Sequence, residues 1–442
     1  MAKQHFINTA TDLIRIENKI PTISDTQTPT NSTDHVVLIV QDGQFVVRNG
    51  GFVGIKINDF TNDRFTFDPT ESDPYIFDGY PEFSYFRDIK VVTLNNSGDE
   101  TQELANYNNP LISGATDGTN GQVMVKFPKL YYKEFLDVNG VLIGIELARY
   151  QKPGMKLHPL FTWGNGRDYI YIGAYEGYLT GSMLSSISGF KPTTNRTIGL
   201  FRGDAINRGG GTQETSNWHL YSYWHEHFLN MLFYLYYGTR DSQAVLGGYT
   251  EGGSFTTPKI RTCGRTNILD TINGSVIVDF DGGDSDILGS VDAGIVIANR
   301  FLFVENFYGH IWKFLDGVGF DGRTGNEGDV WLSNDPRNFT SQESEILLEY
   351  TKSNTIVYTG GDTFVKELGE DLLPITGGGN SSTFYCDQFY SRLTTTPNEF
   401  RVVRGGGALA VGSGAGVAGR SSFGAFSISH STVGSRLCYS EI

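Results

Sequence analysis

One stretch of the sequence has the 3.6-residue period of a helix, and it constrains the fold more than any other feature. Its apolar residues recur at spacings of three and four and form one stripe: Leu220, Trp224, Phe228, Met231, Leu232 and Leu235. Ser216 or Asn217 is a suitable N-cap, and Gly238 is a suitable stop. The pattern therefore predicts one long helix between these limits.

His225 and His227 lie within this predicted helix. Two residues apart on a helix, their side chains point about 200° away from each other, so the pair cannot hold one metal ion together. We expect both to be partly exposed helix histidines, and we predict no metal ligands.

The rest of the chain reads as short apolar runs broken by glycine. Strand-like runs lie within 88–94, 121–136 and 140–150, and Val138-Asn139-Gly140 has the composition of a hairpin turn. The chain contains 55 Gly, and 13% of its residues are aromatic, which favours a packed core with many loops. We therefore predict an α+β fold with more strand and loop than helix.

The chain of 442 residues is long enough for more than one domain. Residues 1–79 have a polar, proline-punctuated composition, and we expect them to form a small β-rich domain for attachment or oligomerisation. Residues 80–442 would form the main domain, with 80–160 as a β-rich lead-in.

The overall charge excludes several classes of partner. A net charge of −15 supplies no basic surface for nucleic acid or anionic lipid.

No apolar run approaches the roughly 18 residues that span a membrane, so we expect no membrane insertion. The N-terminus has no apolar segment of the kind that signal peptides carry, so we expect synthesis in the cytoplasm.

Few residues suggest a cofactor. Cys263, Cys386 and Cys438 are scattered and lack the spacing of a zinc site. Asp281–Asp292 resembles a calcium loop only loosely, because the terminal glutamate is missing, and a solvated turn is the favoured interpretation. We predict no cofactor and leave calcium open. No phosphate-binding glycine motif or GxSxG elbow occurs, and paired carboxylates of a glycosidase are neither supported nor excluded.

Three stretches occur together in a recognisable order: YIYIGAYEGY (169–178), HIWKFLDGVGF (310–320) and RVVRGG…VGSRLC (401–438). They resemble the formylglycine-generating-enzyme branch of the C-type lectin fold. Further stretches, among them RTIGLFRGDAINRG, resemble phage tropism-determinant and receptor-binding proteins of that branch. The resemblance covers roughly 80–442. It implies a C-type-lectin-like domain in a homotrimeric adhesin (a tail-fibre or receptor-binding protein) of the phage virion tail, in contact with other tail proteins and with a host cell-surface protein or glycan.

The resemblance also allows the enzyme interpretation to be tested. The two catalytic cysteines of formylglycine-generating enzymes would fall at Ala410 and Ala415. Alanine cannot replace a thiol that reacts, and the histidine set of the related sulfoxide synthases is not evident. We therefore expect no enzymatic activity. A catalyst of either type, a glycan hydrolase in the same fold and a purely structural virion component are the alternatives.

What remains is a segment that presents a ligand surface, residues 401–438. In the tropism-determinant relatives this span is diversified by a retroelement through adenine mutagenesis, which yields codons that cannot encode Lys, Glu, Gln, Met or Trp. Residues 408–432 contain none of these five, although low-complexity composition would have the same result. The predicted ligand-binding residues are Ala408, Ala410, Val411, Ser413, Ala415, Val417, Phe423, Ala425, Phe426, Ser427, Ile428, Ser429 and His430.

The residues at the two ends of this segment are also predicted to have defined structures. Val402–Arg404 and Val433–Leu437 would be strands, and Arg404 and Arg436 would pair with buried acceptors. The alternation over 425–430 predicts another strand, with Phe426, Ile428 and His430 on one face, either exposed or buried. Small residues between the flanks would form a shallow surface that tolerates substitution.

Overall fold

The computed structural model describes the backbone of residues 36–41, 44–49 and 52–56, and residues 85–149, 151, 153–164, 166–277, 296–322, 327–357, 361–391 and 400–441. The chain divides into two units, Met1–Gly50 and Gly51–Ile442. In the smaller unit, β1 (Val36–Gln41) and β2 (Gln44–Asn49) form an antiparallel hairpin.

The division lies before the boundary at 79/80 that composition predicted. The reason is strand pairing: β3 (Phe52–Lys56) is antiparallel to β8 (Leu142–Ala148) and so belongs to the larger unit. The Asp281–Asp292 stretch and most of residues 1–79 lie outside the described residues.

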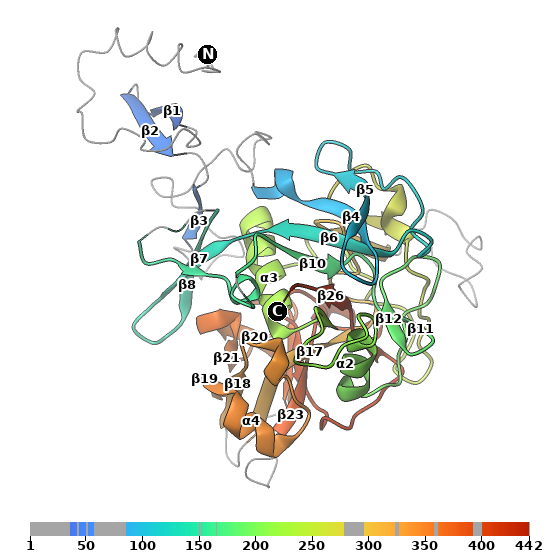
Figure 1. Ribbon diagram of the computed structural model, residues 1–442. Coiled ribbons are helices and arrows are strands. Elements are labelled where there is room, and N and C mark those ends of the chain that lie inside the picture. Colours follow the sequence, from blue (N-terminus) through green and yellow to red (C-terminus); the bar gives the residue numbers. More distant parts are fainter. Residues whose placement is uncertain are drawn as a thin grey trace. The chain divides into compact units, whose positions relative to one another are not determined.

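The larger unit is mainly β, with few helices, which confirms the α+β class (Figure 1). Its helices are α2 (Ile198–Ile206), α3 (Tyr223–Tyr237) and α4 (Glu343–Glu349) among the described residues. The predicted strands of the lead-in are present as β4 (Lys90–Leu94), β6 (Gln122–Pro128), β7 (Tyr131–Leu136) and β8.

The predicted hairpin turn also forms. Strands β7 and β8 are antiparallel, and Asp137 closes the turn by donating its backbone N–H to the carbonyl of Val141 at 2.8 Å. Gly140 adopts φ 78°, a left-handed conformation that glycine tolerates without strain.

Two large sheets organise the described part of this unit. The six-stranded sheet has the order β13-β26-β10-β6-β4-β5, so the last strand of the chain lies among early ones (Figure 1). Its further strands are β5 (Glu100–Asn106), β10 (Tyr169–Gly173), β13 (Trp218–Leu220) and β26 (Leu437–Tyr439).

The nine-stranded sheet has the order β18-β19-β21-β20-β22-β24-β23-β17-β25, and it closes on itself because β17 also pairs with β18. It is therefore close to a barrel. Its strands are β17 (Trp312–Gly322), β18 (Glu327–Leu332), β19 (Thr351–Val357), β20 (Gly361–Leu368), β21 (Pro374–Gly377), β22 (Gln388–Ser391), β23 (Phe400–Gly405), β24 (Arg420–Ser422) and β25 (Val433–Gly434).

Smaller sheets complete the unit. The remaining strands are β9 (Lys156–Leu157), which pairs with β7, the hairpin β11 (Tyr178–Thr180) and β12 (Met183–Ser185), and the group β14 (Gly274–Ile277), β15 (Val296–Phe301) and β16 (Val304–Glu305).

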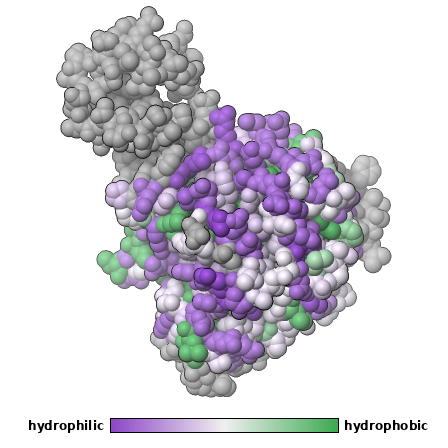
Figure 2. Space-filling model, viewed as in Figure 1, coloured by the Kyte–Doolittle hydropathy of each residue, from purple (hydrophilic) through white to green (hydrophobic). Residues whose placement is uncertain are grey.

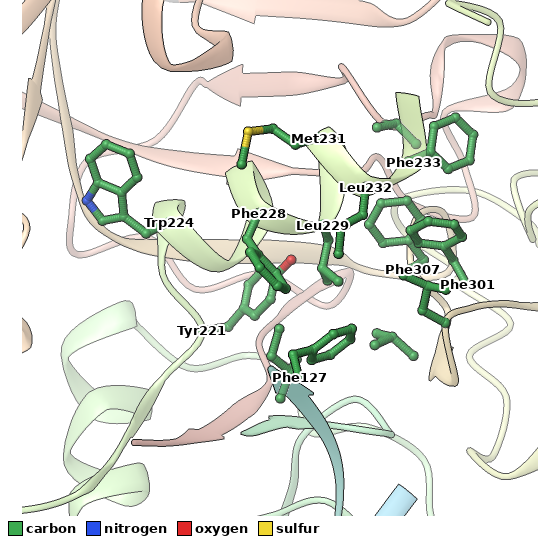
Figure 3. Packing of buried hydrophobic residues seen from close by; sticks show 14 of the residues in the cluster. Phe127, Tyr221, Trp224, Phe228, Leu229, Met231, Leu232, Phe233, Phe301 and Phe307 are labelled. Carbon is green, nitrogen blue, oxygen red and sulfur yellow. The ribbon is translucent and has the colours of Figure 1, made fainter. Parts of the chain in front are cut away.

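Helix α3 lies in the core. Its residues from Tyr223 to Leu235 are all buried, as expected for a helix that is covered on every side. Figure 3 shows its apolar side chains packed against rings from other elements, and the Phe228 ring lies 5.3 Å from that of Phe127 on β6. Helix α3 therefore supports both large sheets from within.

The predicted end of this helix is confirmed, but its predicted start is wrong. Gly238 adopts φ 61° and donates its N–H to the carbonyl of Tyr234, as a C-cap does. The N-cap is Ser222 rather than Ser216 or Asn217. The preceding residues Trp218–Leu220 form β13, because they pair with the C-terminal strand β26.

Candidate binding surface at the C-terminal segment

The three motifs that carry the resemblance meet in the interior. One carboxylate oxygen of Glu176 is in hydrogen-bonding contact with Nδ1 of His310, and the other lies 3.8 Å from Nζ of Lys313. Burial alone would raise the pKa of Glu176, but the neighbouring His310 and Lys313 hold it below its ordinary value. Burial lowers the pKa of Lys313 to about 8. These buried charges fix β17 against the loop that follows β10.

A second buried ion pair joins helix α2 to β17. Nε and Nη2 of Arg202 donate to the two carboxylate oxygens of Asp316 at 2.8 and 2.7 Å. This bidentate geometry is the strongest form of a carboxylate–guanidinium contact. It holds the RTIGLFRGDAINRG stretch against the HIWKFLDGVGF stretch.

Both flanks of the C-terminal segment are strands, as predicted. On one side, β23 pairs with β17 and β24. On the other side, β25 runs parallel to the start of β17, and β26 lies between β10 and β13. The predicted Val433–Leu437 strand is divided into two, with Ser435 and Arg436 between β25 and β26.

Arg436 has the predicted structural role. Its guanidinium is buried and donates to the backbone carbonyls of Gly173 at 2.8 Å and Glu305 at 2.5 Å. Arg404 is also buried, and its Nη2 donates to Oγ of Ser421 at 2.8 Å. Burial lowers the pKa of Arg404 to about 10. Both residues hold strands together and neither faces a partner.

The small-residue span from Gly405 to Ser422 is mostly internal, so the predicted shallow surface is wrong for this part. Asn230 donates its amide to the carbonyl of Val417 at 3.0 Å, and Gln243 donates to that of Ala415 at 2.7 Å. The N–H of Ala418 donates to Oδ2 of Asp387 at 2.7 Å. These bonds hold the span against α3 and its neighbours, which makes it scaffold.

Steric crowding explains why this span consists of small residues. A Cβ on Gly416 would collide with Oδ1 of Asp387, and one on Gly407 would lie 2.5 Å from Cβ of Ala415. Gly407 also adopts φ 77°, which disfavours any side chain. Close packing of the backbone, and not replaceability, accounts for the glycines here.

Four of the predicted ligand-binding residues cannot reach a partner. Ala408, Ala415, Val417 and Phe426 are buried, with at most 7% of each residue exposed. Their inclusion was wrong because apolar side chains at these positions pack inward, Ala408 and Phe426 into the cluster beneath β23 and Val417 into the cluster around α3.

The remaining predicted residues reach the surface. Ser413, Phe423, Ser427 and Ser429 are exposed, and Ala410, Val411, Ala425, Ile428 and His430 are half-buried. The predicted strand over 425–430 is wrong, since these residues form turns, with the N–H of Ile428 donating to the carbonyl of Ala425 at 3.0 Å. Phe426 points inward while Ile428 and His430 stay half-buried, so the three do not share one face as predicted.

A loop from elsewhere in the chain adds an aromatic residue that sequence reasoning missed. Phe255 is 43% exposed, and its ring lies 6.2 Å from that of His430 in an edge-on arrangement. Oγ of Ser431 donates to the carbonyl of Phe255 at 3.0 Å, and the N–H of Gly252 donates to that of Leu409 at 2.5 Å. The glycine pair Gly252-Gly253 before Phe255 is typical of a loop, and it was the local sequence feature that could have indicated an exposed position for Phe255.

We call Phe255, Phe423, Ser427, Ile428, Ser429 and His430 the C-terminal surface. Phe423 is 42% exposed and its ring lies 5.4 Å from that of Tyr390 on β22. Burial, and secondarily the charge of Arg404, lower the pKa of His430, so this imidazole is neutral near pH 7. Apart from such sites, the visible face of the molecule is mainly hydrophilic with separate apolar spots (Figure 2).

The helix histidines are fully buried rather than partly exposed. His225 lies near His219 and Cys438, and His227 lies near Glu134 and Asp371. As predicted, the two rings of α3 do not share a site, but each joins a different group of possible metal ligands.

The group around His227 already contains a cation of the protein. Nζ of Lys156 lies 3.8 Å from a carboxylate oxygen of Glu134 and 3.5 Å from one of Asp371. His227 itself is in contact with His158, with 3.0 Å between Nδ1 and Nε2. Burial, followed by the charge of Glu134, raises the pKa of Asp371. Lys156 thus balances these carboxylates without a metal ion.

The cysteines do not resemble nucleophiles. Cys263, Cys386 and Cys438 are buried and form no disulfide with one another, and burial raises the pKa of Cys263 and Cys438 above that of an ordinary thiol. A thiol with a raised pKa is a poor nucleophile near pH 7.

Among the residues that the structure describes, no helix combines the length and the apolar character needed to cross a membrane. No protein family matches the chain, and no curated protein matches it by sequence.

Proposed function

We propose that this chain is a phage virion adhesin whose C-type-lectin-like domain, of the formylglycine-generating-enzyme branch, binds a host surface receptor through the C-terminal surface. The observation that carries the proposal is the contrast within one segment. A buried, hydrogen-bonded span is followed by turns that expose Phe423, Ser427 and Ser429, and Phe255 from another loop contacts His430 and Ser431 of the same segment.

The physical argument is pre-organisation. A surface held by buried bonds loses little conformational freedom when it binds, so more of the contact energy appears as affinity. Aromatic side chains supply large contact areas at a low entropic cost, and serines add adaptable hydrogen bonds. Phe423 and Phe255 are exposed aromatic residues, and Phe255 lies beside the neutral His430, so the C-terminal surface has this composition.

Contacts between the three motifs support the lectin-like branch, since Glu176 contacts His310 directly and reaches Arg436 through Asn306, which donates to Glu176 and accepts from Arg436. The resemblance implies that the protein is a homotrimer present in several copies on the phage tail. Several simultaneous weak contacts would then strengthen binding through avidity. Residues 1–79 would attach the chain to other tail proteins. In this proposal the protein is not an enzyme, because Ala410 and Ala415 stand where the branch has reactive cysteines.

The test is a cell-binding and competition assay. Fluorescently labelled full-length protein should bind susceptible host cells saturably, and an excess of unlabelled protein should block adsorption of the parent phage. A virion protein with a purely structural role would not bind cells, and an enzyme would bind but also release sugar or a modified peptide. Absence of both binding and competition would overturn the proposal.

A further inference from the structure

Three buried side chains with metal-ligating atoms meet where the C-terminal strand joins helix α3. His219 on β13 pairs directly with Cys438 on β26, which places both side chains on one face of the strand pair. His225 belongs to the first turn of α3. One ring nitrogen from each histidine and Sγ of Cys438 all lie within 4.8 Å of one another.

One nitrogen of the His225 ring has no hydrogen-bond partner among the described residues. Nδ1 of His225 lies 3.0 Å from the backbone N of Ser222 and 2.8 Å from its Oγ, so the cap of α3 uses this side of the ring. Nε2 of His225 is buried and has no hydrogen bond among the described residues. A buried polar atom without a partner costs about 1–3 kcal/mol, so a missing partner is expected at Nε2.

The surroundings form a closed shell around the three atoms. The Trp163 ring lies 5.1 Å from that of His219 and 5.7 Å from that of His225, edge-on to both. The ring of Tyr221 stacks on His225 at 5.4 Å. A buried site of this kind excludes water and holds its ligands in fixed orientations.

We propose that His219, His225 and Cys438 bind one thiophilic d10 cation, Zn²⁺ or Cu⁺. Two imidazoles and one thiolate are donors that such ions prefer, whereas calcium and magnesium require oxygen ligands. Zinc bonds of 2.0–2.3 Å place ligand atoms roughly 3.3–3.6 Å apart, so the three side chains move inward by a fraction of an ångström.

The protons balance on binding. Cys438 loses its thiol proton to solvent. His225 binds through Nε2, and its proton moves to Nδ1, which donates it to Oγ of Ser222 at 2.8 Å. The backbone N–H of Ser222 then loses its present bond to Nδ1, a cost that the bond from Nε2 to the ion must exceed. The ring nitrogens of His219 lie 2.8 Å from Oγ of Ser440 and 3.3 Å from the carbonyl of Leu220, so whichever nitrogen binds the ion, the other keeps a contact that orients the ring.

The ion would tie β26 and β13 to the start of α3, and it would therefore stabilise the strand that ends the C-terminal segment. This role does not depend on receptor binding. No sequence spacing indicated it, because His225 and Cys438 lie more than 200 positions apart in the chain.

The test uses purified full-length protein, dialysed against a chelator and then titrated anaerobically with Zn²⁺ or with Cu⁺. One of the two titrations should saturate at one ion per chain and raise the unfolding temperature, and the tighter of the two identifies the ion. Co²⁺ should produce a thiolate-to-cobalt charge-transfer band. Cys438→Ser should lose the band, and Cys263→Ser, a matched change at a buried cysteine outside the group, should keep it.

A second variant guards against misfolding of Cys438→Ser. In Cys263→Ser/Cys386→Ser, Cys438 is the one thiol left in the chain, so a charge-transfer band must come from it. Failure of wild-type protein to bind either ion, or a band that is absent from this double variant, would overturn the site.

Discussion

Gly416 lies directly against the carboxylate of Asp387, so closely that a Cβ on Gly416 would overlap Oδ1. Oδ2 of the same carboxylate accepts the N–H of Ala418 at 2.7 Å. The buried Asp387 carboxylate thus accepts a hydrogen bond from the backbone of the small-residue span, and it leaves no room for a side chain at Gly416. This contact explains why the span looks like a linker in the sequence but is part of the core.

Gly416→Ala should therefore destabilise the protein. Overpacking a buried site costs about 1–3 kcal/mol, and the upper end is expected because the atom that must move is hydrogen-bonded. Chemical denaturation measures the change in the free energy of unfolding. The matched control is Gly203→Ala on helix α2, where a Cβ meets nothing within 4 Å and a small gain in stability is expected. Equal stability of both variants would contradict the crowding argument.

Arg436→Met should be among the most damaging single substitutions. It removes a buried guanidinium that donates to the carbonyls of Gly173 and Glu305, and it leaves both acceptors without that partner. A loss of about 3 kcal/mol or more in the free energy of unfolding is expected. Arg337→Met is the control, because Arg337 is exposed and its guanidinium forms a surface ion pair with Asp335. The account would be wrong if the two variants were equally stable.

Asp387 should make stability depend on pH. Burial raises its pKa well above the ordinary carboxyl value, so between about pH 4 and that raised pKa the folded state binds more protons than the unfolded state. Its contribution to stability is full below pH 4 and is lost as the pH rises. Asp387→Asn should flatten this decline and be the more stable protein at pH 7. The measurement is the free energy of unfolding of both proteins at several pH values in this range. Equal pH dependence in the two proteins would refute the prediction.

A prediction about the DNA follows from the buried positions. If a retroelement diversifies this segment, the adenine-rich codons of its template repeat should correspond to exposed or half-buried positions such as Phe423, Ser427 and His430. At buried positions such as Ala415 and Val417, the corresponding template codons should contain no adenine whose mutation would change the encoded residue. Sequencing the flanking DNA and several progeny variants tests this. Frequent variation at the buried positions would contradict the separation between scaffold and surface.

The local features of the fold could be predicted from the sequence. The strands of the lead-in follow from their apolar runs, the β7–β8 hairpin from Asn139-Gly140, and the end of α3 from Gly238. Each of these depends on residues close together in the chain. The start of α3 could not be predicted, because residues 218–220 pair with a strand more than 200 residues later.

The site was predictable only in part for the same reason. Arg436 was correctly expected to be structural, since a lone arginine between strands needs buried acceptors. The inward position of Ala415 and Val417 depends on Asn230, Gln243 and Asp387, which no local pattern brings near them. Phe255 is placed beside the C-terminal segment by the bond from Ser431 to its carbonyl and by the bond from Gly252 of the same loop to Leu409, which no local pattern predicts.

The central claim is that the C-terminal surface binds the host, and one measurement tests it most directly. It compares the affinity of wild-type protein for host cells with that of Phe423→Ala and Phe255→Ala, together with the control Leu348→Ala, an 81% exposed residue on α4. Loss of an aromatic anchor costs roughly 1–2 kcal/mol or more. We predict about 5–30-fold weaker binding for the first two variants, with unfolding temperatures unchanged, and no effect of Leu348→Ala. Wild-type affinity in both phenylalanine variants would contradict the claim.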